Sequence, residues 1–388
     1  MKHLQRFTWL ISLLVAANSL MLSPAHAQDA AEQNESDSLT IKGEFSLRGF
    51  YDFKPYGAED FSLANIPVGK DKNKKCANGI DLAGAKLGLS KKFPWGDKAI
   101  EFVVRSGLSP EGAKLKAIYI DYDKFRVGRA ISNFCDLSAL PETLFDPPCS
   151  TALASAAQVR WKDQLQGLSY ALAMEKAVEL DIYPAVKKED KGKQKLVPLN
   201  NFPALSAMIK YEESIGYLRL GGLFRMLDYY AKSEDKTRYL PTWGFNLTSS
   251  LKVIPDQTTV KLYGVYGMGM GSYLIGLASS AKACKDVFLQ RNTTPTLINT
   301  LGGYIGLEHR WLPQLRSTAV YGILDTINKK QSDDNAYKQG HFVACNLTYH
   351  PTENLSLGLE YLFGRRFTIG DQNGRDAHRI QTAFGFSF

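Results

Sequence analysis

Basic side chains recur at alternate positions in the apolar segments of this sequence. Lys and Arg together number 47, against 39 Asp and Glu. Arginine offers two parallel donors to a carboxylate, so several such side chains on one face would bind small anions. The five that we expect to form a ring near the middle of that face are Arg48, Lys86, Arg105, Arg160 and Arg225. Opposite them, a single connecting segment supplies Asp136, Glu142 and Asp146, which would complete a transverse field.

Signals for other chemistry are weak. His309, His341, His350 and His378 show neither the spacing of metal ligands nor a hydrolase motif. The stretch "DQNGRD" (371–376) has some likeness to a calcium loop but lacks the later ligands, so we expect a plain turn. We therefore predict no cofactor and no enzymatic activity. The alternative of a barrel hydrolase needs a Ser/His pair near the outer leaflet, and no convincing pair is present.

The positions of these side chains depend on a strict two-residue alternation. In the last ten residues, "RIQTAFGFSF", alternate aromatics lie on one face and small or polar residues on the other. About sixteen segments of about 9–13 residues repeat this pattern, which is the length of a tilted strand that crosses a bilayer. Mean hydropathy of −0.22 excludes a bundle of membrane helices. The uncharged stretch 262–281 imitates a membrane helix, but its glycines favour a strand followed by a loop.

The connections between these segments alternate in length. Short turns such as "KFPWGD", "DYDK" and "HPTEN" are interspersed with long polar loops at 53–79, 133–155, 180–202, 229–240 and 271–299. This pattern is typical of an all-β transmembrane antiparallel β-barrel of about 16 strands, with short periplasmic turns and long extracellular loops. A soluble β-sandwich is the alternative. In the barrel, the polar face lines the lumen, where basic residues outnumber acids: Lys42, Arg48, Lys86, Arg105, Lys116, Arg160, Lys162, Lys210, Arg219, Arg225, Lys261, Arg310, Arg316 and Arg379.

The N-terminal residues have the features of an export signal. Lys2 and Arg6 precede an apolar stretch, and "SPAHA" ends in small residues, so we expect cleavage after Ala27. The predicted organisation is a signal peptide at 1–27, a short periplasmic segment at 28–39 and a barrel at 40–388. The alternative is an N-terminal membrane anchor. Export and the barrel pattern together predict the bacterial outer membrane.

Loop 133–155 differs from the others because it mixes several Leu and Phe residues with its three acids. We expect this loop to fold into the lumen and narrow it. Its cysteines, Cys135 and Cys149, would close a ring of about fifteen residues, which contributes about 3 kcal/mol in the chain-entropy model. Cys76 and Cys284 would join two outward loops, whereas Cys345 is expected to be an unpaired side chain that faces lipid.

Two blocks of sequence resemble the DcaP-like family of outer-membrane porins. The first is "FRVGRAISNFCDLSALPETLFDPPC" with the following "QVRW", and the second runs from "GLEHRWLPQLRSTAVYGI" to the closing "RIQTAFGFSF". The resemblance covers about Leu39 to Phe388 and implies a trimeric sixteen-stranded porin for negatively charged small solutes such as dicarboxylates. Small residues at 83–85 fit a subunit contact. Arg129 and Ser272 depart from the family pattern, which leaves substrate preference open.

The expected partners follow from this assignment. They are small anionic solutes, outer-membrane lipid and two further copies of the chain, with no nucleic acid. The lysine-rich stretches "GKDKNKK" and "KKEDKGKQK" are either solvated loops or contacts for lipopolysaccharide phosphates. A surface adhesin or receptor that uses the long loops remains the alternative function.

Overall fold

A computed structural model describes residues 39–54, 56, 60–68, 76, 78–109, 112–178, 182–183, 196–232, 234–278, 285–289, 295–327, 334–371 and 373–388. The expected signal peptide and nearly all of the N-terminal segment lie outside these residues. The described part is mostly strand, and none of its helices is both long and apolar enough to cross a membrane.

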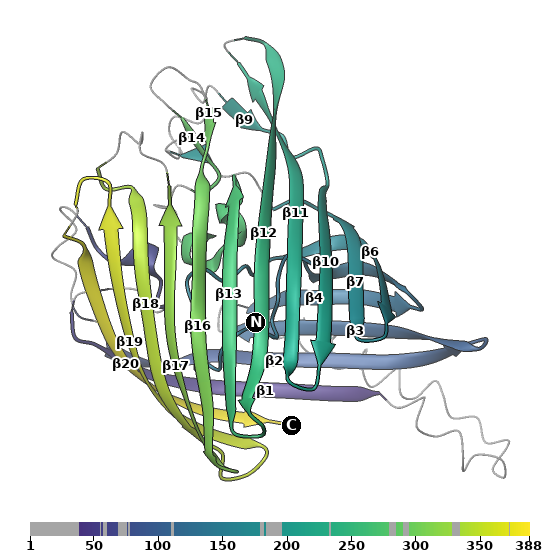
Figure 1. Ribbon diagram of the computed structural model, residues 1–388, viewed down its shortest axis with the longest axis vertical. Coiled ribbons are helices and arrows are strands. Elements are labelled where there is room, and N and C mark those ends of the chain that lie inside the picture. Colours follow the sequence, from purple (N-terminus) through teal and green to yellow (C-terminus); the bar gives the residue numbers. More distant parts are fainter. Residues whose placement is uncertain are drawn as a thin grey trace, which may run out of the picture.

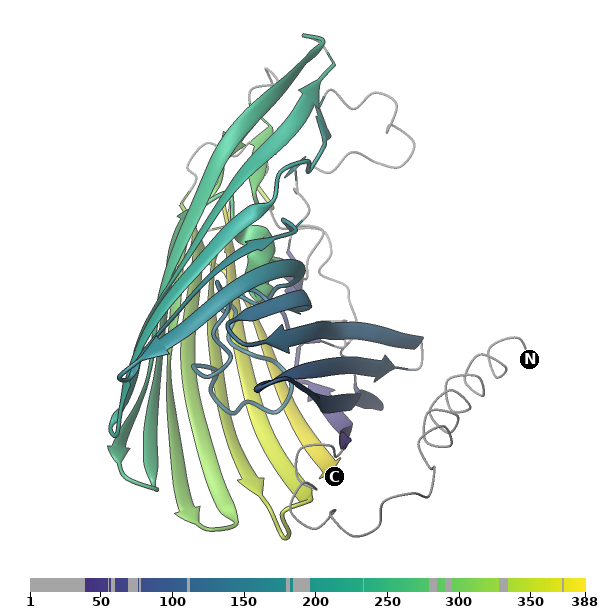
Figure 2. The same cartoon turned by 90° about the vertical axis from the view of Figure 1, so that its right-hand side faces the viewer.

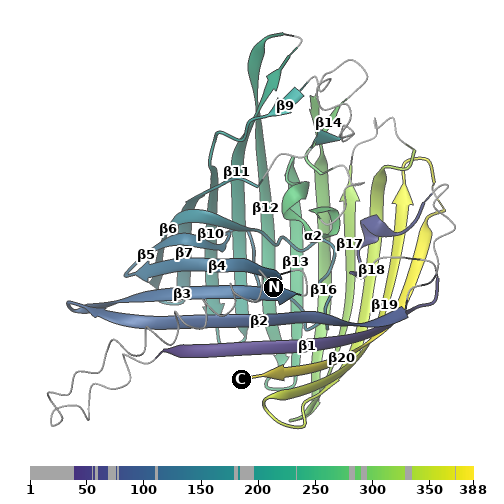
Figure 3. The ribbon, with the colours of Figure 1, turned by 180° about the vertical axis from the view of Figure 1, so that it is seen from behind.

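The principal sheet closes on itself as an antiparallel barrel of 16 strands, which confirms the predicted fold (Figures 1 and 3). The strands are β1 (Thr40–Asp52), β2 (Asn78–Trp95), β3 (Lys98–Ser109), β4 (Gly112–Tyr122), β5 (Phe125–Ile131), β6 (Ser155–Leu165), β7 (Leu168–Glu175), β10 (Ala204–Glu213), β11 (Gly216–Ala231), β12 (Lys236–Ile254), β13 (Thr258–Met268), β16 (Asn299–Leu312), β17 (Leu315–Thr326), β18 (Tyr337–Tyr349), β19 (Leu355–Thr368) and β20 (Arg375–Ser387).

Several short elements lie at the end of the barrel that carries the long loops. The strand β9 (Leu196–Pro198) pairs with β11, while β8 (Ile182–Tyr183), β14 (Val287–Leu289) and β15 (Pro295–Leu297) form a separate small sheet. The helical turns η1 (Leu63–Asn65), η4 (Gly271–Tyr273) and α2 (Ile275–Ala278) interrupt the connecting loops. Stretch 262–281 is therefore a strand followed by a loop, as expected, through its last described residue, 278.

The first and last strands close the barrel, and their pairing accounts for the aromatic C-terminus. Phe45 lies opposite Phe386, and Leu47 lies opposite Phe384, with all four side chains exposed on the outer face. Phe388 is fixed by two backbone hydrogen bonds to Gly43, of 2.9 and 3.0 Å. The alternation thus puts apolar side chains outside and leaves no free edge at this seam.

The strands vary in length more than the sequence pattern predicted. β5 has 7 residues and β7 has 8, whereas β11 has 16 and β12 has 19. The predicted long loop 229–240 is wrong, because β11 continues to Ala231 and β12 begins at Lys236. Alternating polar and apolar residues in that stretch continue the ladder as a tall hairpin, visible above β6 and β7 in Figure 1.

Candidate functional site

The segment between β5 and β6, residues 132–154, lies inside the barrel against the inner face of β11 to β20. Figure 2 shows it as an irregular blue segment in front of the green and yellow strands. Its ends are joined by a 3.0 Å hydrogen bond from the Ser132 amide to the Ala154 carbonyl. Side chains of the wall bind its backbone: Tyr304 donates to the Ala139 carbonyl at 3.2 Å, and Glu360 accepts from the Leu144 amide at 3.1 Å. We call residues 132–154 the inward segment.

Glycines in the wall provide the space in which the inward segment sits. A Cβ atom at Gly306 would lie 2.8 Å from Pro141, and one at Gly358 would lie 2.5 Å from Leu144. Both distances are shorter than carbon atoms tolerate, so a larger residue at either position must displace the segment or the strand. The inner wall and the inward segment are therefore complementary in shape.

Two further segments fold against the inner wall near the long-loop end. Residues 60–66 include η1, and residues 269–278 include η4 and α2. Leu63, Phe134, Tyr273 and Leu277 belong to one buried hydrophobic cluster that joins these two segments to the inward segment. A cavity of about 210 Å³ lies among the three segments, lined in part by Asp60, Phe61, Phe145, Asp146, Ile275 and Phe342.

Buried arginines hold these segments through backbone carbonyl groups. Arg366 of β19 donates to the carbonyls of Ala64 at 2.6 Å and Ile66 at 3.1 Å. Arg219 of β11 donates to the carbonyls of Asn133 and Cys135. Because each guanidinium carries several donors in a rigid fork, one side chain can fix two carbonyls. These cations support the loops and do not line an open channel.

Three members of the predicted cationic ring also have partners within the protein. Arg225 is fully buried, donates to the Val178 carbonyl at 3.0 Å and pairs with Asp286 at 2.9 Å. Arg48 makes two hydrogen bonds to Asp81, of 3.1 and 2.7 Å, and is 3% exposed.

Arg160 donates to the Gln158 amide oxygen at 2.9 Å and to the Ile131 carbonyl. A lumen-facing position in the sequence therefore did not make any of the three a free cation, because nearby acids, amide oxygens or backbone carbonyls accept hydrogen bonds from each of them.

The three predicted acids do not form one face opposite the cations. Asp136 is buried and accepts hydrogen bonds from Tyr217 at 2.9 Å and Thr248 at 2.6 Å, which anchors the inward segment to β11 and β12. Asp146 accepts from the Phe61 amide at 3.0 Å, and burial raises the pKa of its carboxyl to about 6. Of the three, Glu142 alone is partly exposed, and it lies at the tip of the inward segment.

The remaining two predicted cations, Lys86 and Arg105, project into the lumen from the opposite wall. Lys86 of β2 pairs with Glu44 of β1 at 3.0 Å, and both side chains are exposed. Arg105 of β3 is exposed and has no ion pair or side-chain hydrogen bond within the described residues.

Three lysines extend this exposed patch. Lys42 and Arg105 are both registered with Gly88, Lys114 is registered with Gly107, and Lys116 lies within 3.0 Å of a Cβ position at Gly107. We define Lys42, Lys86, Arg105, Lys114 and Lys116 as the basic wall. Lys114 was not among the lumen cations expected from the sequence, although it lies two residues from Lys116, which was.

The expected disulfide bonds are absent among the described residues. Cys135 and Cys149 are both free and buried. The Cys135 sulfur accepts a hydrogen bond from the Ala154 amide at 3.1 Å, whereas the Cys149 carbonyl accepts one from the Gly276 amide at 2.9 Å. The two residues are thus held by different neighbours, and Ser132 and Ala154 close the segment instead. Cys76 is exposed and free, Cys345 is exposed and free, and Cys284 lies outside the described residues.

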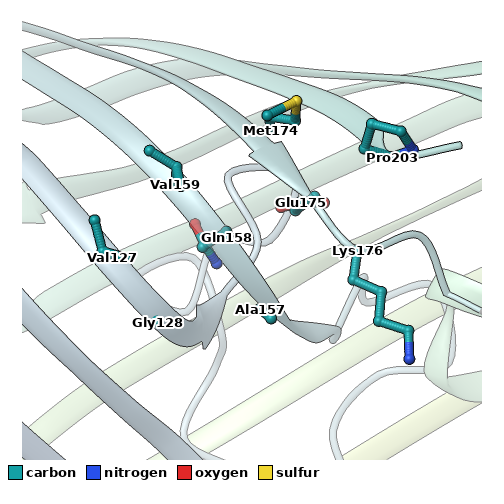
Figure 4. Close-up of a pocket in the computed structure, with 9 residues that line it drawn as sticks. All are labelled: Val127, Gly128, Ala157, Gln158, Val159, Met174, Glu175, Lys176 and Pro203. Atoms are coloured by element: carbon teal, nitrogen blue, oxygen red, sulfur yellow. The ribbon is translucent and has the colours of Figure 1, made fainter.

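The outer face has a shallow hollow of about 380 Å³ over β5, β6 and β7. Val127, Val159 and Met174 point outward around it, while Gln158 and Glu175 point to the other side of the sheet (Figure 4). The apolar side chains continue the outer band of the barrel. This hollow therefore belongs to the outer surface and is separate from the lumen.

Comparison with solved structures agrees with this architecture. No family model and no curated protein sequence matches the chain. The outer membrane channel DcaP of Acinetobacter baumannii has a TM-score of 0.76 and 19% identity, covering 92% of this chain and 98% of its own. The anion-selective porin from Comamonas acidovorans has a TM-score of 0.61 and 12% identity, covering 91% and 100%. Salmonella typhi OmpF in complex with daunomycin has a TM-score of 0.60 and 10% identity, covering 92% and 99%.

These likenesses confirm the expected similarity to the DcaP channel at the level of the fold. The chain therefore has the sixteen-stranded barrel fold of outer-membrane channels.

Proposed function

We infer that this chain is an outer-membrane porin, a passive diffusion channel that prefers small anionic solutes such as dicarboxylates. The observation that carries the inference is the basic wall. Four of its five cations, Lys42, Arg105, Lys114 and Lys116, have no acidic partner within the described residues, and Glu44 is the partner of the fifth. The inward segment occupies the opposite wall, so solutes would pass along the basic wall.

The physical reason for anion preference is the field of these cations. Walls of low dielectric constant focus the field of unpaired charges into the lumen, which raises the local concentration of anions and lowers that of cations. Lysine and arginine donors replace part of the hydration of a passing carboxylate. The cations are exposed and solvated, so binding stays weak and the solute is released.

A homotrimer is part of the proposal. The trimer form of OmpT from Vibrio cholerae, with a TM-score of 0.51 and 10% identity, supports it. Strands β5 and β7 are shorter than the ~9–11 residues that a lipid-facing strand needs, so another subunit is better suited than lipid to cover this side. Of the small residues at 83–85, Ala85 lies opposite Phe45 on the outer face, but Gly84 lies opposite Ser46 on the inner face. Cross-linking in mild detergent that yields only monomer would contradict the trimer.

The organisation of the chain is proposed with the same function. Residues 1–27 would be removed on export, residues 28–39 would lie in the periplasm, and the barrel would begin at residue 40. N-terminal sequencing of protein isolated from outer membranes should begin after Ala27. An N-terminus at Met1 would instead support the membrane-anchor alternative.

Reversal potentials in a planar bilayer test the anion preference. The variant in which Lys42, Arg105, Lys114 and Lys116 are all replaced by Gln should lower the anion-to-cation permeability ratio roughly threefold or more. The matched control replaces Lys98 and Lys124 by Gln in the same way. Near the short turns, Lys98 pairs with Asp123 at 2.8 Å, and Lys124 pairs with Asp163 at 2.6 Å. An unchanged ratio in the first variant, with pore formation intact, would refute the role of the basic wall.

A further inference from the structure

A second group of basic side chains lies at the short-turn end of the lumen, below the tip of the inward segment. Arg310 and Arg316 are registered opposite each other on β16 and β17, two residues inside a tight turn. His350 follows the last residue of β18 and is fixed there by a 2.8 Å hydrogen bond from its amide to the Gln314 carbonyl. Like charges directly opposite on one face of a sheet repel each other, so an anion between or beside the two arginines would be stabilising.

Glu142 of the inward segment pairs with this cluster loosely. Its Oε2 lies 3.6 Å from Arg316 Nη1, and its Oε1 lies 3.9 Å from His350 Nε2. Both distances exceed those of hydrogen bonds. Arg316 Nε and His350 Nε2 are buried atoms that have no hydrogen-bond partner within the described residues. The carboxylate thus offsets only part of the charge of the cluster and leaves some of its donors without a partner.

The backbone of Glu142 is held much more firmly than its side chain. Its amide donates to Glu308 Oε1 at 2.8 Å, and its carbonyl accepts from Asn346 at 2.6 Å. The side chain is 40% exposed, so its carboxylate has room to rotate away while the segment stays in place. A carboxylate from solution could then occupy the position that it leaves.

We propose that Arg310, Arg316 and His350 form a carboxylate-binding site at this end of the lumen, with Glu142 as its built-in competitor. This site rests on the proposed function, because it acts on an anion that has already crossed the barrel along the basic wall. The guanidinium forks supply paired donors suited to a carboxylate. A solute that displaces Glu142 breaks the ion pairing of that carboxylate with the cluster. The net free energy of binding is therefore small, so the solute stays weakly bound and is released.

The test measures how succinate blocks single-channel chloride current, with uncharged succinamide as the solute control. Glu142→Gln should lower the half-blocking succinate concentration by about three- to tenfold, because the competing charge is gone. Arg316→Gln should raise that concentration. Succinamide should block neither of these two variant channels. The matched control is Glu212→Gln, which removes a carboxylate near another short turn, where Glu212 pairs with Lys210 at 2.6 Å.

The outcomes separate this site from the broader function. Equal block in Glu142→Gln, Glu212→Gln and the unmodified protein would overturn the site while leaving an anion-preferring pore. Absence of any pore in the unmodified protein would overturn the proposed function itself. If Glu142→Gln does not fold, Glu142→Asp keeps the charge but withdraws it from Arg316, and it should shift the block in the same direction. No shift in that variant would also refute the site.

Discussion

Arg379 of β20 and Asp52 of β1 form an ion pair across the seam where the barrel closes. Arg379 Nε lies 2.7 Å from Asp52 Oδ1, and Nη2 lies 3.1 Å from Oδ2, with both side chains fully buried. The two residues are registered opposite each other in the ladder that joins the first and last strands. The guanidinium also lies 4.5 Å from the centroid of the Phe50 ring. Residues far apart in the chain thus fix one register of closure.

Removal of one member of this pair should destabilise the barrel strongly. Arg379→Met leaves the Asp52 carboxylate buried without its cation, at a cost of about 3–5 kcal/mol. The temperature at which the folded band disappears in semi-native electrophoresis should fall accordingly. Arg379→Met combined with Asp52→Leu should recover much of the loss. Lys98→Gln, which breaks an exposed pair, is the control and should have little effect. A double variant no more stable than Arg379→Met would contradict this account.

A larger side chain at Gly358 should move the tip of the inward segment. Leucine at this position would collide with Leu144, and overpacking of this kind costs about 1–3 kcal/mol. Single-channel conductance should change, because the segment occupies part of the lumen. Gly84→Leu is the control, since a Cβ at Gly84 meets no atom within 4 Å. Equal conductance in Gly358→Leu and the unmodified protein would show that Leu144 moves aside without shifting the backbone.

The stability of the folded protein should depend on pH through Asp146, which lies on the inward segment that connects β5 and β6. Burial raises the pKa of this carboxyl from 3.8 to about 6, although the nearby Arg48 charge and the Phe61 amide partly offset the effect. An acid whose pKa is raised by folding binds its proton more tightly in the folded state, so stability falls as the pH rises from about 4 to 6. The folded band should therefore persist to higher temperature at pH 5 than at pH 7.5. Asp146→Asn should reduce this difference, and an unchanged difference would assign it to other groups.

Thiol labelling distinguishes the free cysteines from the expected disulfides. In the folded protein, a water-soluble maleimide should label Cys76 readily, because this cysteine is exposed and free. Cys135 and Cys149 are buried, and burial raises the pKa of both thiols to about 12. In the absence of reductant, they should therefore react only once the protein is unfolded. Recovery of a peptide in which Cys135 is linked to Cys149 would contradict the structure. Cys76→Ser provides the background of labelling at the other positions.

The alternation of the sequence predicted the barrel and the face of most strand residues. Two-residue periodicity is a local property, so Phe384 and Phe386 could be assigned to the outer face without knowledge of any partner strand. The rule is interrupted at the β-bulge near Arg105, where an extra residue in β4 changes the face on which Lys114 and Lys116 lie relative to Ile118.

The sequence could not show whether each lumen cation is buried and paired or exposed to solvent. Arg225 and Arg105 have the same residue type and the same predicted face, yet one is fully buried against loop carbonyls and the other is exposed. The difference depends on where the inward segments dock, which is set by contacts between residues more than a hundred positions apart, such as Glu308 and Glu142. Wall glycines such as Gly306 were a signal of that docking, but they cannot be told apart from strand glycines without the fold.

The way in which the inward segment is held separates its position from its chemistry. Tyr304, Arg219 and Asn346 bind carbonyl groups of the segment, and Glu308 and Glu360 bind its amides, so much of the anchoring is independent of the side chains that the segment presents. Side chains of the segment that do not contact the wall can therefore change without moving its backbone. The barrel thus holds the segment in one place while the surface that the segment presents to the lumen varies, independently of the cations of the basic wall.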